Sequence, residues 1–395
     1  MIGPSSSNHT RLYDLFTDNG IVQGVFIENK TFHYIQHPIQ TEKFIWEKQY
    51  GKRSNHLVWT LFHKFFHQLG FLPNLEGTAN TSLMKLDSKI LALFERDVPY
   101  QLDLCFKTKT LSTLGRLGLH KIRYFSAHSK QIGDYVYTAE YDFIQKKVKF
   151  HQISLSLDQL YRSYTISTTY IPILHDFIIH NDSILFLDSP FEYSFSELCK
   201  GRFPIHLNSQ KPSYFIQVDL HTGNLQRYVY PHGICIFHYS KCIDWKHQMI
   251  IYAPIYETLN FNHLQNEAHY QKISLDKRIS KVQIDTNPYL NQFNVDFPIQ
   301  YGDWTILRHL NHQEQRIDRL LICKDLELIH ALTYQNHSLC GEPIIIPSDR
   351  FDLLLVCTNS SLFITRLDTF QSEEISLNTT VQLSFHSLWI PFSSE

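Results

Sequence analysis

The sequence predicts an all-β fold of the β-propeller class, on the evidence of strand periodicity, composition and continuity. Short runs of alternating apolar and polar residues, separated by turn residues, recur from one end of the 395-residue chain to the other. Phenylalanine (28) and tyrosine (22) are abundant and glycine (14) is sparse, which is typical of strands and aromatic-lined cavities. The sequence shows no repeat of fixed length. The propeller prediction therefore rests on the large number of short hairpins in one long domain.

Three hairpins and two buried strands are the clearest elements. Residues 184–188 and 351–357 are more uniformly apolar than the other runs and are predicted to be buried strands. The expected hairpins pair 25–27 with 31–34, 216–220 with 225–230, and 361–367 with 374–377.

One segment, residues 57–69, has apolar residues at helical rather than strand spacing, with Ser54 or Asn55 available as its N-cap. Its apolar face could line an entrance, touch a membrane, or be ordinary core, and we favour core. His63 and His67 stand four residues apart and could bind a metal on one face. Because no third ligand or general-base glutamate accompanies them, a partly exposed helix is the favoured interpretation.

The chain is predicted to be one domain, 1–395, because no linker-like stretch or change of composition interrupts it. Lysine plus arginine total 36 and aspartate plus glutamate 38, so nothing electrostatic favours a nucleic-acid partner.

The sequence also predicts a cytoplasmic protein. Its seven cysteines are odd in number and form no CxxC pair, which favours reduced thiols. Neither a signal peptide nor an apolar run long enough to span a membrane is evident, and a peripheral membrane contact stays open.

Four histidine-centred segments, around His128, His175, His238 and His386, are the candidate metal site. Neutral imidazoles leave a divalent ion its full charge and suit iron, copper or zinc. They lie far apart in sequence, so only a closed fold could bring them together. Two other histidines, His180 and His232, lie close in sequence to candidate ligands and are alternative candidates. His180 should face away from the position of His175 by strand alternation, whereas His232 shares the parity of His238 but sits in a turn-like setting.

The surroundings of these histidines resemble the carotenoid cleavage oxygenase family, which includes stilbene-cleaving dioxygenases and the retinoid isomerase of the eye. Each matching segment is short, but together and in this order they are specific. They are TDNGIVQG (17–24), GTANT (77–81), LALFE (91–95), SAHSK (126–130), HDF (175–177), ILFLDSP (184–190), GEP (341–343) and FHSLW (385–389).

This resemblance implies a seven-bladed β-propeller with a few short helices capping the iron-bearing face. It implies that His128, His175, His238 and His386 hold Fe(2+) as the one cofactor. It further implies that O2 and an electron-rich alkene, held in an apolar tunnel, give two carbonyl products.

The resemblance also assigns supporting residues. Family glutamates that orient the histidines match Glu95 and Glu342, and the third position is Asp296. Because aspartate is one methylene shorter, we expect Asp296 to make a longer or water-mediated contact and to weaken iron binding. Thr81 matches a family threonine whose methyl group limits one open coordination position; an ordinary strand or turn threonine is the alternative.

The expected substrate is an apolar polyene, a carotenoid or apocarotenoid. Stilbene-cleaving relatives place a lysine and a tyrosine where this chain has Phe94 and Pro38, so a grip on a phenol is missing. Phe94 is therefore the predicted substrate-pocket residue, with plain core as its alternative. A stilbenoid substrate is the second enzymatic reading.

A propeller that binds an apolar ligand or a protein partner without catalysis is the alternative from another class. Asp296 motivates it, as does the start of the chain, which is short relative to the family. Ser387, where the family has glycine, is a further departure.

Overall fold

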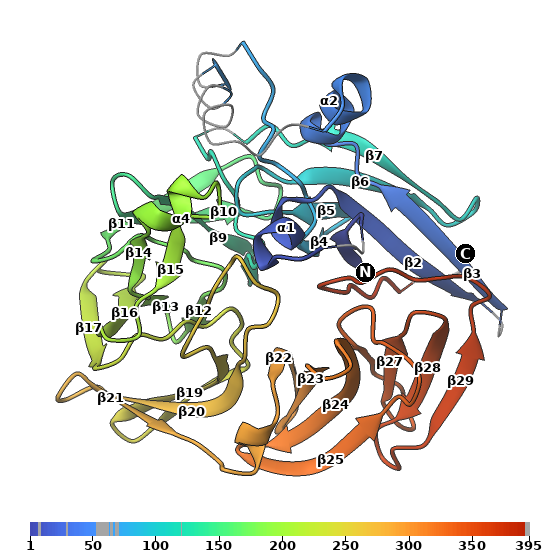
Figure 1. The fold of residues 1–395 in the computed structure, drawn as a ribbon. Helices are drawn as coiled ribbons and strands as arrows, with labels where there is room; N and C mark the ends of the chain where they lie inside the picture. The colour runs from blue at the N-terminus through green and yellow to red at the C-terminus, as the bar shows by residue number, and fades with distance from the viewer. Residues whose placement is uncertain are drawn as a thin grey trace.

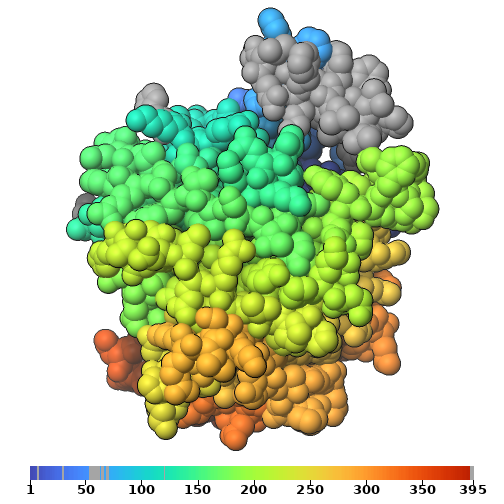
Figure 2. Space-filling view, turned by 90° about the vertical axis from the view of Figure 1, so that its left-hand side faces the viewer, coloured from blue at the N-terminus to red at the C-terminus, as the bar shows by residue number. Residues whose placement is uncertain are grey.

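The computed structural model describes residues 1–6, 9–28, 31–52, 63, 66–67, 71–119 and 121–391, and the statements below concern those residues. The fold is all-β and propeller-like: successive sheets follow one another around a common centre (Figure 1). From the side, the colours run in bands from teal through green and yellow to orange, so sheets that follow in sequence are neighbours in space (Figure 2).

The N-terminal half forms three antiparallel sheets. A three-stranded sheet contains β1 (Ile2–Pro4), β2 (Gly20–Glu28) and β3 (Thr31–Pro38). The next has β4 (Ser82–Leu86), β5 (Lys89–Leu93), β6 (Tyr100–Cys105) and β7 (Thr110–Arg116). The third has β8 (Lys130–Ile132), β9 (Tyr135–Asp142), β10 (Lys147–Ser154) and β11 (Leu160–Ser167).

The middle of the chain forms an eight-stranded sheet in the order β12-β13-β16-β17-β21-β20-β19-β18. Its strands are β12 (Ile178–His180), β13 (Ser183–Asp188), β16 (Ser213–Asp219), β17 (Leu225–Tyr230), β18 (Lys241–Trp245), β19 (Gln248–Ile255), β20 (His269–Asp276) and β21 (Lys281–Asp285). Its two antiparallel halves meet at a single parallel pair, Val229 with Lys281. A small hairpin, β14 (Phe191–Tyr193) with β15 (Ile205–Leu207), stands apart.

Two more four-stranded sheets complete the chain. One has β22 (Val295–Tyr301), β23 (Trp304–Asn311), β24 (Arg316–Lys324) and β25 (Glu327–Thr333). The last has β26 (Ile344–Ile346), β27 (Leu353–Cys357), β28 (Ser361–Arg366) and β29 (Ser372–Ser376).

The predicted hairpins are confirmed: β2 pairs with β3, β16 with β17, and β28 with β29. The predicted buried strands are confirmed as β13, buried throughout, and β27, buried from its second residue.

Helices are few and short: α1 (Leu12–Thr17), α2 (Glu42–Tyr50), α4 (Phe195–Cys199) and the 3-10 turn η1 (Leu290–Gln292). The hydroxyl of Thr41 accepts a hydrogen bond from the backbone N–H of Phe44 and caps α2. The helix predicted over residues 57–69 falls almost wholly outside the described residues. No helix in the described part of the chain is long and apolar enough to cross a membrane.

The core consists of apolar layers between neighbouring sheets, because each strand sends alternate side chains to either face. Phe150 of β10 and Phe186 of β13 meet across one such layer, with Phe177 beside them. These apolar layers hold each sheet against the next. They therefore position the strands that lie nearest the centre of the ring.

The two ends of the chain are joined at the closure of the ring. Ile2 and the last histidine segment exchange backbone hydrogen bonds: Ile2 N–H to His386 C=O at 3.0 Å, and Phe385 N–H to Ile2 C=O at 2.8 Å. The buried amide of Gln23 donates to the carbonyl of Gln382 and the hydroxyl of Ser384, both at 3.0 Å. These contacts place His386 relative to the first sheet.

Candidate metal centre

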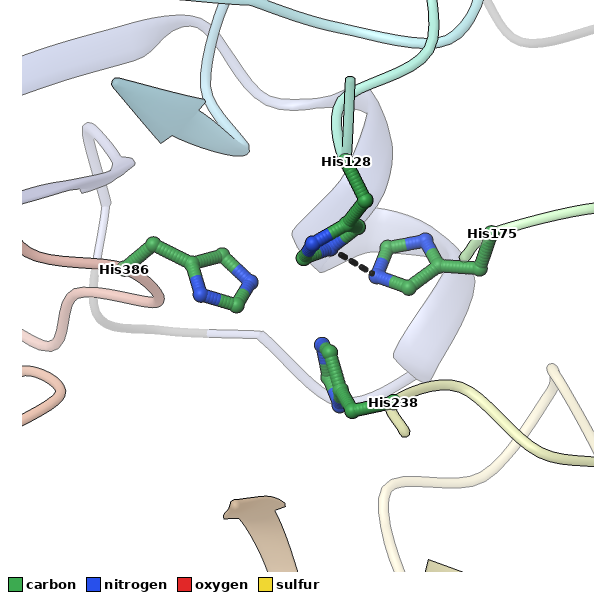
Figure 3. A group of neighbouring side chains, drawn as sticks. All are labelled: His128, His175, His238 and His386. Atoms are coloured by element: carbon green, nitrogen blue, oxygen red, sulfur yellow. Dashed lines mark hydrogen bonds between the residues drawn. The ribbon is translucent and has the colours of Figure 1, made fainter. Parts of the chain in front are cut away.

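The four histidines predicted as ligands come together, with their rings turned toward one another (Figure 3). One nitrogen from each lies within 4.8 Å of the corresponding nitrogens of the other three. His128, His175 and His238 stand in the irregular segments that lead into β8, β12 and β18, each at the edge of its sheet, and His386 follows β29. Sheet packing therefore fixes their backbones independently of one another.

Three of the four imidazoles are each held by a carboxylate at Nδ1. The pairs are His175 with Glu95 at 2.6 Å, His238 with Asp296 at 2.8 Å, and His386 with Glu342 at 3.2 Å. Nδ1 of His238 and Nδ1 of His386 form hydrogen bonds with these carboxylates, which leaves Nε2 of each ring as a lone-pair donor. Nδ1 of His175 is in contact with Oε1 of Glu95, so its Nε2 also points away from the carboxylate.

Asp296 corrects the expectation of a long or water-mediated contact, because it reaches His238 directly. The register of β22 against β23 shifts between Asp296 and Ile299, and Phe297 has a φ of 56°. Such a bulge re-aims a side chain, which explains how the shorter carboxylate reaches the ring. Its other oxygen accepts a hydrogen bond from the Tyr256 hydroxyl at 2.7 Å.

Burial favours the neutral ring that a metal needs at His128 and His386, whereas the charge of Asp296 acts in the opposite direction at His238. Burial lowers the pKa of His128 well below its ordinary value, and repulsion by His175 lowers it further. Burial also lowers the pKa of His386. Burial alone would lower the pKa of His238 too, but attraction by Asp296 outweighs it and the pKa is raised.

The geometry fits a bound cation. Nε2 of His238 and Nε2 of His386 are buried and have no hydrogen-bond partner. Nε2 of His128 lies at hydrogen-bond distance, 3.0 Å, from Nε2 of His175, and the tautomers of the two rings set which nitrogen donates (Figure 3). Buried polar atoms without partners are costly, and a divalent ion among these four nitrogens would satisfy them all. Metal ligation by the four stays a prediction.

The competing histidines lie elsewhere. His180 is on β12 beside Asp244, at 3.5 Å, and His232 is exposed. Nδ1 of His67 is 3.0 Å from the carbonyl of Leu72. Among the residues that the structure describes, the four-histidine group is the one cluster with metal-binding geometry.

An apolar cavity of about 440 Å³ adjoins one side of the group. His175 and Glu95 reach it, and Phe94, the predicted pocket residue, is part of its wall. Much of the remaining wall is aromatic: Tyr13, Phe16, Tyr141, Phe143, Phe203, Phe237 and Phe261. Charged residues also line it: Asp14, Asp18, Lys43, Glu47, Lys52, Glu76 and Arg96. Such a cavity suits an apolar ligand of small-molecule size.

Thr81 is buried just before β4, and its hydroxyl donates to the side-chain oxygen of Asn80 at 3.1 Å. Its predicted part in limiting a coordination position stays a prediction.

Comparison with known proteins decides the family. A model of the retinal pigment epithelial membrane protein family matches residues 1–391. The chain belongs to this family, the carotenoid cleavage oxygenases. The resemblance found in the sequence motifs is thus confirmed.

Plant members of the carotenoid cleavage oxygenase family are among its curated relatives. Carotenoid 9,10(9',10')-cleavage dioxygenase 1 of Arabidopsis thaliana is 26% identical over 211 residues, and the same enzyme of Pisum sativum is 26% identical over 207. The Arabidopsis match spans 49% of this chain and 39% of that enzyme, and the Pisum match spans 48% and 38%.

Solved structures show the same fold. The cobalt-substituted apocarotenoid oxygenase of Synechocystis aligns with a TM-score of 0.76 and 16% identity, over 99% of this chain and 91% of that one. The lignostilbene dioxygenase of Pseudomonas brassicacearum aligns with a TM-score of 0.78 and 18% identity, over 96% and 88%.

Sequence reasoning missed one interior residue of this carotenoid cleavage oxygenase, Arg308 on β23. Its guanidinium donates to the carbonyl of Phe385 at 3.0 Å and lies 4.2 Å from the ring centre of Phe297. Burial lowers the pKa of Arg308 to about 10, while attraction by Glu342 and Asp296 works against that change. A lone arginine within an apolar strand was the available signal.

Proposed function

We propose that this protein is a non-haem iron(II) dioxygenase that cleaves a C=C bond of a carotenoid or apocarotenoid. The alkene and one O2 would give two carbonyl compounds, each taking one oxygen atom. The observation that carries the proposal is the convergence of His128, His175, His238 and His386 beside an aromatic-lined cavity.

The proposed metal chemistry rests on the donor set. Ferrous iron held by these four neutral imidazoles would supply the redox chemistry that activates dioxygen. Glu95, Asp296 and Glu342 would hold three of the rings in the tautomer that offers Nε2 to the metal. Arg308 would offset the buried charge of Glu342, whose pKa is lowered by His386 although burial alone would raise it.

The apolar cavity would bind and orient the alkene. Its aromatic residues would pack against the alkene, and Phe94 supports packing against a polyene rather than a hydrogen bond to a phenol. This favours a carotenoid or apocarotenoid over a stilbenoid, although the lignostilbene dioxygenase shares the fold.

The finer architecture belongs to the same proposal. We infer seven blades, by counting each half of the eight-stranded sheet as one blade and the three-stranded sheet as another. We infer that residues 1–395 act as one domain, because hydrogen bonds from β1 and β2 tie the start of the chain to the segment of His386. Cytoplasmic location, with or without peripheral contact to a membrane that holds the substrate, is part of the proposal.

The test combines iron analysis with product analysis. Protein reconstituted with iron(II) should hold one iron per chain and convert a panel of apocarotenoids to aldehydes or ketones that carry label from 18O2. Mass spectrometry identifies the cleaved bond. Faster turnover of resveratrol-like stilbenes than of any polyene would replace the substrate with a stilbenoid.

A non-catalytic propeller is the outcome if iron binds in full but no oxygen is consumed with any polyene or stilbene. Protein that refuses iron altogether would contradict the metal assignment itself.

A further inference from the structure

A second cavity, of about 250 Å³, adjoins the histidine group and is polar. We name it the axial cavity, because its wall takes residues from sheets around the whole ring, from Ser82 at β4 to Pro298 on β22 and Ser387 near the C-terminus. His128, His238 and His386 line it, whereas His175 lines the apolar cavity. The four imidazoles therefore stand between an apolar space and a polar one.

The two cavities differ in what they can pass. The larger cavity has charged as well as aromatic residues in its wall, but only His175 of the four histidines lines it. An ion beside its aromatic rings would lose hydration without replacement, and that cost is large. The axial cavity offers oxygen atoms from Ser129, Asp176, Tyr239 and Glu342 as well as three histidine rings. A hydrated divalent cation would keep polar partners there on its way to the buried Nε2 atoms.

One ion pair stands in the wall of the axial cavity. Nζ of Lys130 is 2.7 Å from Oδ1 of Asp176. The lysine side chain is 34% exposed and the aspartate 4%, so the pair extends from solvent into the interior. The carboxylate of Asp176 also accepts hydrogen bonds from the backbone N–H groups of Phe177, at 2.7 Å, and Tyr239, at 3.2 Å.

The position of this pair suggests what it does. Lys130 is the one lysine or arginine among the described residues of the axial wall. Its charge repels a metal ion and masks the carboxylate that would attract one. A lysine is a flexible point charge on a long stem, so it can swing aside without moving the backbone.

We propose that the axial cavity is the route by which the divalent metal reaches and leaves the four histidines, and that the Lys130–Asp176 ion pair controls its passage. The proposal rests on the proposed metal site but not on its catalytic activity. It assigns the apolar cavity to the substrate alone.

The test measures metal exchange rather than turnover. Cobalt(II) is mixed with metal-free protein in a stopped-flow instrument, and its absorption gives the association rate; excess chelator then gives the dissociation rate. For Lys130→Gln we expect both rates to rise about tenfold, the low end of what local electrostatic fields do to on-rates. The Kd should not weaken, since the variant removes a charge that repels the bound ion and leaves every proposed ligand in place.

A second variant separates the carboxylate from simple loss of the lysine. Adding Asp176→Asn to Lys130→Gln removes the attracting charge and should cancel most of the faster association. Lys149→Gln is the matched control, because the Lys149 side chain is 36% exposed and Nζ lies 3.8 Å from a carboxylate oxygen of Glu140. Lys149 is on β10, outside the wall of the axial cavity. The exchange rates of this control should equal those of the parent protein.

A third variant tests the competing route. Leu75→Trp fills part of the apolar cavity and should leave both cobalt rates unchanged. Slower loading in this variant would move the route to the apolar side and overturn the proposal.

Two results with Lys130→Gln would also overturn it. One is unchanged exchange. The other is a faster dissociation rate alone with a weaker Kd, which would show that Lys130 only stabilises the site. Protein that takes up cobalt normally but has no oxygenase activity would contradict the proposed function and leave the route intact.

Discussion

At the scale of single residues, the carboxylate partners decide what the histidines can do. A histidine without a fixed tautomer presents either nitrogen, whereas His175, His238 and His386 have Nδ1 committed to Glu95, Asp296 and Glu342. Removal of a histidine ligand should therefore lower the metal affinity more than removal of the carboxylate that holds it.

Removal of one ligand should abolish tight metal binding. For His175→Ala we expect the metal affinity to fall by more than the roughly 100-fold that loss of an outer carboxylate costs. Metal analysis after purification and a chelator competition titration measure it. His180→Ala is the control, because His180 lies beside Asp244 outside the group. Full iron content in His175→Ala would refute the ligand assignment.

Removal of a carboxylate that holds a histidine should weaken metal binding without abolishing it. Asp296→Asn keeps the shape but loses the charge that holds His238, so we expect metal affinity to fall about 10- to 100-fold. Tyr256→Phe removes only the hydrogen bond to the other oxygen of Asp296 and should have a smaller effect. Equal affinity in Asp296→Asn and the parent, measured by the same competition titration, would show that the aspartate does not support the metal.

At the scale of elements, the irregular segments at the centre are positioned by close backbone contacts. Gly20 opens β2 against the segment that leads to Thr81. A Cβ at Gly20 would stand 2.4 Å from the carbonyl oxygen of Ala79 and 2.7 Å from that of Thr78. Backbone atoms yield less readily than a flexible side chain, so this contact tolerates no side chain.

The variant Gly20→Ala should be destabilised by about 1–3 kcal/mol, the usual cost of overpacking a well-packed site. Urea unfolding followed by tryptophan fluorescence measures it. Gly118→Ala is the matched control, because a Cβ at Gly118 meets nothing within 4 Å, and its stability should be unchanged. Equal loss in both variants would mean that the close approach is not the cause.

At the scale of the whole molecule, the metal would tie together segments that belong to different sheets of the ring. His128 and His386 belong to opposite parts of the sequence, and their ring centres lie 4.6 Å apart. The unfolded chain cannot assemble that group, so bound metal should favour the folded state.

Metal should accordingly raise the unfolding temperature. At a free metal concentration 100 times Kd, the folded state gains about 2.7 kcal/mol. Differential scanning calorimetry of metal-free and reconstituted protein measures the gain. His175→Ala should show no such rise, and a rise as large as that of the parent would place the metal elsewhere.

The sequence by itself determined much of this protein. Period-two alternation predicted the hairpins, since a strand buries alternate side chains, and β2–β3 and β16–β17 confirm it. Short motifs in a constant order led to the family and to the four histidines. Local pattern was sufficient there because the chemistry needs certain residue types in certain neighbourhoods.

Only the tertiary structure decided the rest. Aspartate is shorter than glutamate, yet Asp296 makes a direct contact with His238, at a point where the register of β22 is interrupted by a bulge. The contacts of Arg308 and the Lys130–Asp176 pair likewise join residues that are distant in sequence, which only the tertiary structure brings together. The alternation of apolar and polar residues predicts which face of a strand a side chain lies on. Which residues that face contacts depends on how the sheets close into a ring.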